Sequence, residues 1–229
     1  MNGTVLLVSS VPEAFAGLVA DDLAGAGHGY SLFLSGGGTA TACYRALADR
    51  SGLPWPAVDI YLGDERCVPP DHPDSNHRMI TEVLLDAVGP VHADYPMFGS
   101  GPATEAAAAY QRLVAELRPD LVHLGLGPDG HTASLFPGST GLADADPDHL
   151  VVANTDPNGV NPHERITLTL SGIALARRTV ITVAGASKRD ALSRIRAGED
   201  LPASRVTGPD VVWLVDADAL GDGTPDRVA

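Results

Sequence analysis

The sequence predicts an α/β fold of three layers, in which a mostly parallel, twisted sheet carries helices on both faces. Apolar, β-branched runs of strand length recur along the 229 residues, helical patterns lie between most of them, and 44% of the residues are hydrophobic. Runs that are apolar throughout are typical of strands buried on both faces, as in a parallel sheet. We find no internal repeat and no linker, so we expect a single domain over residues 1–229.

The expected strands, in chain order, are Thr4–Val8, Tyr30–Leu34, Val58–Leu62, Leu121–Leu126, Leu150–Ala153, Ile166–Leu170, Thr179–Val183 and Val211–Val215. Apolar residues share a helical face at Phe15, Leu18, Val19 and Leu23; at Met79, Ile80, Val83 and Leu84; at Ala106, Tyr110, Leu113, Val114 and Leu117; and at Ala191, Leu192 and Ile195. The Pro/Asp-rich segments 66–74 and 137–149 are expected to be ordered, and the tail from Gly221 to be frayed.

The composition excludes several classes of partner. A formal net charge of −14 argues against nucleic acid and anionic membranes, which require a basic face, but it leaves room for a small anionic substrate in one locally basic pocket. The N-terminus lacks the features of a secretory signal, and no apolar run approaches the ~18 residues that span a bilayer. We therefore expect a soluble, cytoplasmic protein, either a monomer or a weak homo-oligomer.

Cysteines and histidines form no metal pattern. Cys43 and Cys67 are too few for a disulfide framework, which favours two reduced thiols in a reducing compartment. His72 and His77 lack a third ligand at suitable spacing. We expect neither a metal site nor a cofactor.

A glycine run after the fourth expected strand has the pattern of a dinucleotide-binding loop. The segment Gly125–Gly130 satisfies G-x-G-x-x-G, but a dinucleotide site also needs a full crossover helix that opens at the third glycine. Pro137 and the glycine after it break the chain about two turns later, too early for that helix. The pattern therefore favours a tight turn that presents Asp129 and His131.

A second glycine loop, Ser35-Gly-Gly-Gly-Thr39, follows the second expected strand and precedes a helical pattern that contains Tyr44. Glycine amides at a helix start favour phosphate, and a plain tight turn is the alternative. No Gly-Lys-Ser/Thr follows, which argues against a Walker loop, and Ser35 lacks the G-x-S-x-G context of a nucleophile. The predicted phosphate ligands are Gly36, Gly37, Gly38 and Thr39.

Charged residues follow the third expected strand, at Asp64-Glu-Arg66. Buried charges are costly unless they pair or meet a ligand, so the alternatives are an Asp/Arg pair that pins the loop and a binding site. Asp74 is expected to be the N-cap of the next helix, which places Asn76 and Arg78 in its first turn.

Two further cations lie near strand ends. Ser187 is expected to be an N-cap, which would place Lys188 in a first helical turn. A cation is unfavourable there unless an anion binds, and a surface lysine is the alternative.

Arg165 precedes the expected strand Ile166–Leu170, whereas the other motifs follow strands. We predict that this strand is antiparallel, because its start would then bring Arg165 to the pocket at the carboxyl ends of the other strands.

Together and in order, these segments resemble the 6-phosphogluconolactonase family. The resemblance covers nearly the whole chain, and Asp-Gly-His-Thr-Ala-Ser-Leu-Phe-Pro together with Asp-Glu-Arg is its specific part. The matching segments are Ser35–Thr39, Gly63–Arg66, Asp74–Asn76, Gly125–Pro137, Glu164–Leu168 and Gly185–Lys188.

A related family, the glucosamine-6-phosphate deaminases/isomerases, is similar at Asp64-Glu65, Asp129 and His131. It carries an aromatic residue where Arg66 stands, and Asn-Glu-Pro where Ser134–Pro137 stands, and both differences favour the lactonase. His163 lies where a proline often precedes the Glu-Arg pair.

The resemblance implies hydrolysis of 6-phospho-D-glucono-1,5-lactone to 6-phosphogluconate in the oxidative pentose phosphate pathway, without a metal. A histidine, with an ordinary pKa of about 6.5, can take a proton from water and return it to the ring oxygen. His131 is the candidate base, oriented by Asp129 or Asp64, with Arg66 at the oxyanion. The candidates for substrate and phosphate binding are the glycine loop, Asn76, Arg78, Arg165 and Lys188. The alternatives are a deaminase/isomerase-like enzyme and a non-catalytic module that binds sugar phosphates.

Overall fold

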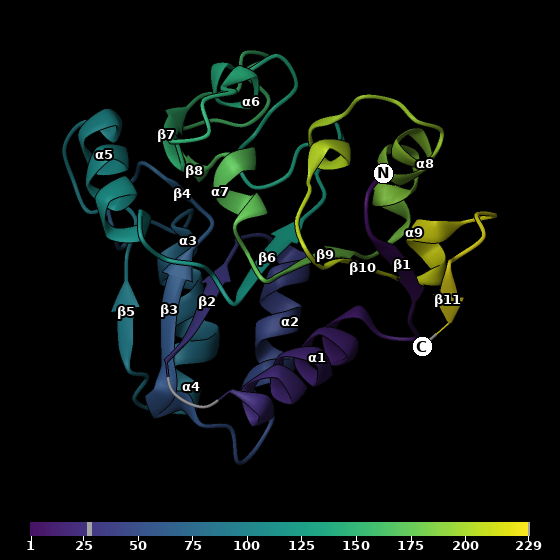
Figure 1. The fold of residues 1–229 in the computed structure, drawn as a ribbon, viewed down its shortest axis with the longest axis horizontal. Helices are drawn as coiled ribbons and strands as arrows, with labels where there is room; N and C mark the ends of the chain where they lie inside the picture. Colours follow the sequence, from purple (N-terminus) through teal and green to yellow (C-terminus); the bar gives the residue numbers. More distant parts are fainter. Residues whose placement is uncertain (27–28, 229) are drawn as a thin grey trace.

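The computed structural model describes residues 1–26 and 29–228, and the chain in these ranges forms two sheets (Figure 1). The large sheet is parallel throughout, in the order β11-β1-β10-β9-β6-β2-β3-β5. Its strands are β1 (Thr4–Leu7), β2 (Tyr30–Leu34), β3 (Val58–Leu62), β5 (Ala93–Tyr95), β6 (Leu121–Gly125), β9 (Arg178–Val183), β10 (Val211–Val215) and β11 (Arg227–Val228). The small sheet is antiparallel, in the order β4-β8-β7, with β4 (Asp64–Arg66), β7 (Val151–Asn154) and β8 (Arg165–Leu168).

Helices cover both faces of the large sheet, and this confirms the predicted α/β class. In Figure 1, α1 and α2 lie below the sheet, whereas α5, α7 and the small sheet lie above it. The helices are α1 (Val11–Gly25), α2 (Gly38–Ala48), α3 (Asn76–Ile80), α4 (Asp86–Val88), α5 (Ala103–Val114), α6 (Thr140–Ala143), α7 (Leu170–Ala174), α8 (Arg189–Arg196) and α9 (Ala217–Leu220), with a π-helical turn at Thr81–Leu85 between α3 and α4. None of the helices in the described ranges has the length and apolar character that crossing a bilayer requires.

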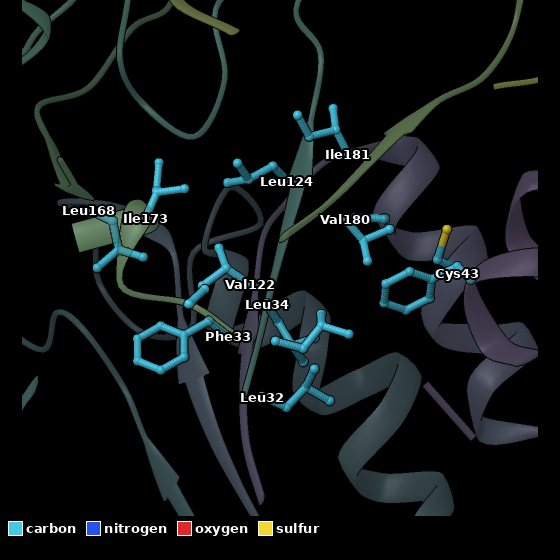
Figure 2. Packing of buried hydrophobic residues seen from close by; sticks show 14 of the residues in the cluster. Leu32, Phe33, Leu34, Cys43, Val122, Leu124, Leu168, Ile173, Val180 and Ile181 are labelled. Carbon is cyan, nitrogen blue, oxygen red and sulfur yellow. The ribbon is translucent and has the colours of Figure 1, made fainter. Parts of the chain in front are cut away.

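The core follows from the apolar strand runs. Every residue of β2 is buried, as a strand covered on both faces requires. Because successive side chains of a strand alternate in direction, Phe33 lies on the side of Leu168 and Ile173, whereas Leu32 and Leu34 point the other way (Figure 2). The two sides of the sheet are therefore packed by different parts of the chain.

The order of the strands reverses between β2 and β6. After β2 the chain adds β3 and β5 on one side, and it then returns to add β6, β9 and β10 on the other side. In open α/β sheets, a crevice for ligands opens at this reversal, beyond the carboxyl ends of the strands. Both glycine loops begin here, one after β2 and one at the end of β6.

The strand at Arg165 is antiparallel, as predicted, but it pairs with β4 and β7 in the small sheet and not with the parallel strands. It ends at Leu168, since Thr169 accepts a hydrogen bond from the N–H of Gly172 and caps α7. The charged triplet Asp64–Arg66, expected to be a loop, forms β4. A three-residue strand of charged residues carries no apolar pattern from which it could be predicted.

Three other local predictions are wrong. The N-cap of α3 is Ser75 and not Asp74, because the Ser75 hydroxyl accepts a hydrogen bond from the first turn. Ser187 caps nothing and lies within a 3₁₀ turn at Ala186–Lys188 that precedes α8. In the described part of the tail, residues 221–228, the chain is not frayed, since β11 pairs with β1 and the Asp226 carboxylate accepts a hydrogen bond from an N–H of β1.

Candidate active site

A cleft lies over the reversal between β2 and β6, where open α/β sheets bind their ligands. Loops from the large sheet and residues of the small sheet meet in it. The predicted site residues that line it are Gly36, Gly37, Gly38, Thr39, Asp64, Arg66, Asn76, His131, Arg165 and Lys188. The antiparallel small sheet therefore brings Arg165 to the other motifs, as the sequence predicts.

In the glycine loop after β2, Gly36 has no room for a side chain and Gly37 has a left-handed backbone. Gly37 has a φ of +99°, and a Cβ at Gly36 would lie 1.8 Å from Oδ1 of Asn76. Helix α2 begins at Gly38, so its first N–H groups have no intrahelical carbonyl to bind. An anion in the cleft could accept hydrogen bonds from these groups and would interact favourably with the helix dipole.

Tyr44 and His123 support this loop from inside the core. The N–H of Ser35 donates to the Tyr44 hydroxyl over 2.8 Å, and this hydroxyl lies 2.8 Å from Nδ1 of His123. Nε2 of His123 lies 2.9 Å from Oγ1 of Thr182. Burial lowers the pKa of His123 to about 3, so its ring is neutral at physiological pH. The sequence-based prediction did not include this pair, although a lone histidine inside an apolar strand was an available signal.

Glu65 of β4 is buried and points away from the cleft, at the start of α3. Its carboxylate accepts four hydrogen bonds, from the N–H groups of Arg66, Asn76 and His77 and from the Ser75 hydroxyl. Burial raises the pKa of Glu65, and these donors oppose that rise. Glu65 is therefore a structural anchor that fixes β4 to α3, while Asp64 and Arg66 reach the cleft.

We expect Glu65→Gln to lower the free energy of unfolding by about 2–3 kcal/mol. The amide replaces one acceptor oxygen of the carboxylate by an NH₂ group, which is itself a donor and would face the buried donors that now bind this oxygen. Urea unfolding followed by circular dichroism should show a lower midpoint with an unchanged slope. Glu116→Gln, at an exposed carboxylate, is the matched control and should change stability by less than about 0.5 kcal/mol. Equal midpoints for the two variants would contradict the anchoring role.

Asp64 holds the loop that follows His131. Its Oδ2 accepts a hydrogen bond of 2.6 Å from the Ser134 hydroxyl. Asn76 donates through Nδ2 to the Asp64 carbonyl over 2.8 Å, and its buried Oδ1 has no hydrogen-bond partner among the described residues. Asn76 therefore offers an acceptor at the cleft.

His131 is oriented by Asp129. Nδ1 of His131 lies 2.5 Å from Oδ1 of Asp129, which also accepts from the His131 N–H. Burial raises the pKa of Asp129, but the hydrogen bonds and charge of His131 outweigh it, so the pKa lies below its ordinary value. A carboxylate at Nδ1 favours the tautomer with a lone pair on Nε2, the form that a general base needs. Of the two carboxylates that the sequence left open, Asp129 is the one in contact with this ring.

The glycines of G-x-G-x-x-G serve the turn and the histidine. A Cβ at Gly127 would lie 2.1 Å from Nδ1 of His131, so the ring packs directly on the backbone. The N–H of Gly127 donates to the carbonyl of His131 over 2.8 Å and closes the turn. Gly130 has a φ of +87°, and a Cβ there would lie 2.7 Å from Leu201.

Three cationic side chains line the cleft, those of Arg66, Arg165 and Lys188. Burial lowers the pKa of Arg165, and the charge of Arg66 lowers it further. Burial also lowers the pKa of Lys188, against the opposing charge of Asp129. In the described part of the chain none of the three forms an ion pair with a carboxylate, so no Asp64–Arg66 pair pins the loop. Uncompensated, partly buried cations favour an anionic ligand.

Arg78 does not line the cleft, contrary to the prediction. Its Nε donates to Glu82 over 2.6 Å, and its Nη1 donates to the carbonyl of Asp71. The acidic residue four positions later on the helix was the signal for this contact.

The remaining candidates also have other partners. Nε2 of His77 lies 2.7 Å from Oδ2 of Asp94, and His72 accepts a hydrogen bond from the backbone of Asp74. Both cysteines are free thiols, and burial raises the pKa of each to about 12, so neither is a thiolate near neutral pH.

The family model described as glucosamine-6-phosphate isomerases/6-phosphogluconolactonase matches residues 5–213 of this chain. The chain belongs to this family. A 6-phosphogluconolactonase of Nostoc sp. is 39% identical over 207 residues, which cover 83% of either chain. The crystal structure of 6-phosphogluconolactonase from Thermotoga maritima matches with a TM-score of 0.82 at 31% identity, over 94% of this chain and all of that one.

A monomeric glucosamine-6-phosphate deaminase has the same fold, with a TM-score of 0.79 over 94% of this chain and 98% of that one. At 21% identity this likeness shows the fold alone. Membership of the isomerase/lactonase family confirms the resemblance that the motifs indicate, and the structural neighbours confirm the fold class.

Proposed function

We propose that this chain hydrolyses 6-phospho-D-glucono-1,5-lactone to 6-phospho-D-gluconate, a step of the oxidative pentose phosphate pathway. The observation that carries the proposal is the His131–Asp129 pair at a cleft lined by three unpaired cations. A base suits the opening of an ester, and the cations suit a phosphorylated substrate. Relatives named 6-phosphogluconolactonase, at 39% and 40% identity, support this choice of substrate.

In the proposed reaction, Nε2 of His131 takes a proton from water while the water oxygen attacks the carbonyl carbon C1. Arg66 stabilises the negative charge that develops on the carbonyl oxygen, and Asp129 stabilises the imidazolium. The C1–O5 bond of the tetrahedral intermediate then breaks, and His131 returns the proton to O5. One water is consumed, no oxidation state changes, and the new carboxylic acid ionises in solvent.

The remaining residues would bind the substrate. The first N–H groups of α2 in the segment Gly36–Thr39, together with Arg165 and Lys188, suit the phosphate because they combine helix-terminal donors with positive charge. Oδ1 of Asn76 is an acceptor, which suits a sugar hydroxyl. Asp64 acts indirectly, since its bond to Ser134 holds the loop that follows the base.

Lys188→Met is expected to raise KM for the phosphorylated lactone by about tenfold or more, because a charge-assisted contact to phosphate is lost. Turnover of unphosphorylated glucono-1,5-lactone should change little. Lys188 is the only lysine of the sequence, so acylation of its amine can be followed by mass, and 6-phosphogluconate should protect it. Equal losses on both lactones, or no protection, would refute phosphate binding by Lys188.

The proposed function is tested by two assays on the same purified protein. One follows the opening of freshly generated 6-phosphogluconolactone, corrected for spontaneous hydrolysis, and the other follows ammonia release from glucosamine 6-phosphate. We expect activity in the first assay only. Activity in the second alone would assign the chain to the deaminase branch of the family, and binding without turnover in either would make it a sugar-phosphate-binding module.

A further inference from the structure

Two arginines lie directly opposite each other at the cleft. In the antiparallel register of the small sheet, Arg66 of β4 pairs with Arg165 of β8, and both line the cleft. Like charges at directly opposed positions of a sheet repel each other, and the charge of Arg66 contributes to the lowered pKa of Arg165. Other contacts must therefore hold the two guanidinium groups in place.

Each guanidinium is held by one backbone carbonyl outside the sheet. Nη1 of Arg66 donates to the carbonyl of Asp74 over 2.7 Å, and Nη2 of Arg165 donates to the carbonyl of Pro162 over 3.0 Å. The Nε atoms of both arginines are buried, with no hydrogen-bond partner among the described residues. The positions of the two cations therefore depend on the positions of the loops that carry these carbonyls.

The side chain of His163 joins these loops. Its Nε2 lies 3.0 Å from Oδ2 of Asp74, whose carbonyl holds Arg66, and His163 itself follows Pro162, whose carbonyl holds Arg165. His163 has a φ of +75°, and within the described ranges Ala133 is the only other non-glycine residue with a positive φ. Such a conformation carries strain that persists only where surrounding contacts enforce it.

We propose that His163 and Asp74 form a clasp that positions Arg66 and Arg165 for one anionic substrate. This inference rests on the lactonase function proposed above. His163 is a positioning residue, because it acts through Asp74 and through the loop carbonyls. The clasp fixes the spacing of the two cations before the ligand arrives, so less conformational freedom is lost on binding.

A neighbouring histidine supports the clasp. The N–H of Asp74 donates to Nδ1 of His72 over 3.1 Å, and the ring centroids of His72 and His163 are 5.6 Å apart. The hydrogen bond from His163 is the main cause that lowers the pKa of Asp74, so its carboxylate is ionised at neutral pH. Asp74 is therefore a charged acceptor whose backbone N–H is held by His72 and whose carboxylate is held by His163.

The test compares two variants that place a similar, unbranched side chain at the positive φ of residue 163, so that backbone strain is the same in both. His163→Met removes the donor, whereas His163→Gln places an amide N–H at a similar reach, so the two differ in the contact to Asp74. For the phosphorylated lactone we expect His163→Met to lower kcat/KM about tenfold. The displaced Arg66 should lower kcat, and the displaced Arg165 should raise KM. His163→Gln should stay within about threefold of wild type. The thermal midpoint of both variants should stay within about 3 °C of wild type.

A double variant tests the pairing itself. If the two residues act through their contact, His163→Met combined with Asp74→Ala should lose no more activity than Asp74→Ala alone. Additive losses, or equal kcat/KM for the Met and Gln variants, would overturn the clasp.

Failure of the lactonase function would appear separately, as a wild type that does not open the lactone. Calorimetric titration with inorganic phosphate would then still decide the inference, because it measures the position of Arg165 without turnover. Weaker binding by His163→Met than by His163→Gln would support the clasp, and equal binding would refute it.

Discussion

His131→Ala is expected to lower kcat for 6-phosphogluconolactone at least ~100-fold while the fold stays intact. The variant loses the group that takes the proton from water, whereas the glycine loop and the cations that bind the phosphate remain. KM should therefore change much less than kcat. The measurement is the initial rate with freshly generated lactone, corrected for spontaneous hydrolysis, beside a circular dichroism spectrum that reports the fold.

His92→Ala is the matched control. The His92 side chain is exposed, and its Nδ1 lies 2.7 Å from Oδ1 of Asp59, outside the residues that line the cleft. We expect wild-type kinetics from this variant. Wild-type turnover by the His131→Ala protein would remove His131 from the role of base.

Arg66→Gln is expected to lower kcat by about 100-fold to 1000-fold, because a preorganised donor at a developing oxyanion is worth about 3 to 4 kcal/mol. The effect should fall on both the phosphorylated and the unphosphorylated lactone, since the carbonyl is common to them. Steady-state kinetics with the two substrates measure it.

Arg165→Gln and Arg112→Gln are the comparisons for this variant. Arg165 is assigned to the phosphate, so its loss should raise KM for the phosphorylated lactone and spare the unphosphorylated one. Arg112 is exposed on α5, and its loss should change neither substrate. A KM effect confined to the phosphorylated lactone in Arg66→Gln would contradict the oxyanion role and place Arg66 at the phosphate.

The fold class could be predicted because its evidence is local. Six of the parallel strands, at Thr4, Tyr30, Val58, Leu121, Thr179 and Val211, are mainly apolar runs, and the predicted bounds differ from the structure by at most one residue at an end. Strand β5 at Ala93–Tyr95 and the strand β4 are only three residues long, and their pairing comes from neighbours distant in sequence. No periodic pattern marks such strands.

The candidate site also contains some contacts that could be predicted from the sequence and others that could not. Asp129 and His131 are two residues apart on one turn, so their contact could be expected from the sequence. The contacts of Glu65 with α3, of Asp64 with Ser134 and of Tyr44 with His123 join residues far apart in the chain, and only the fold brings them together. These contacts could be identified only from the structure.

At Arg78, an ion pair with a nearby residue explains why the motif-based prediction is wrong. Its position in the first turn of α3 suggested the cleft, but Glu82 lies one helical turn away and holds its guanidinium. Arg165 shows the opposite case. Its strand is antiparallel, as predicted, but it lies in the small sheet and not among the parallel strands, and the small sheet brings Arg165 to the cleft.

The rate at which the purified protein opens 6-phosphogluconolactone at neutral pH is the decisive measurement for the proposed lactonase function. We expect hydrolysis at least a hundredfold faster than the spontaneous reaction with catalytic amounts of protein, in the range that a general base alone contributes. A rate equal to that of the lactone in buffer, from a protein that is folded and binds 6-phosphogluconate, would contradict it.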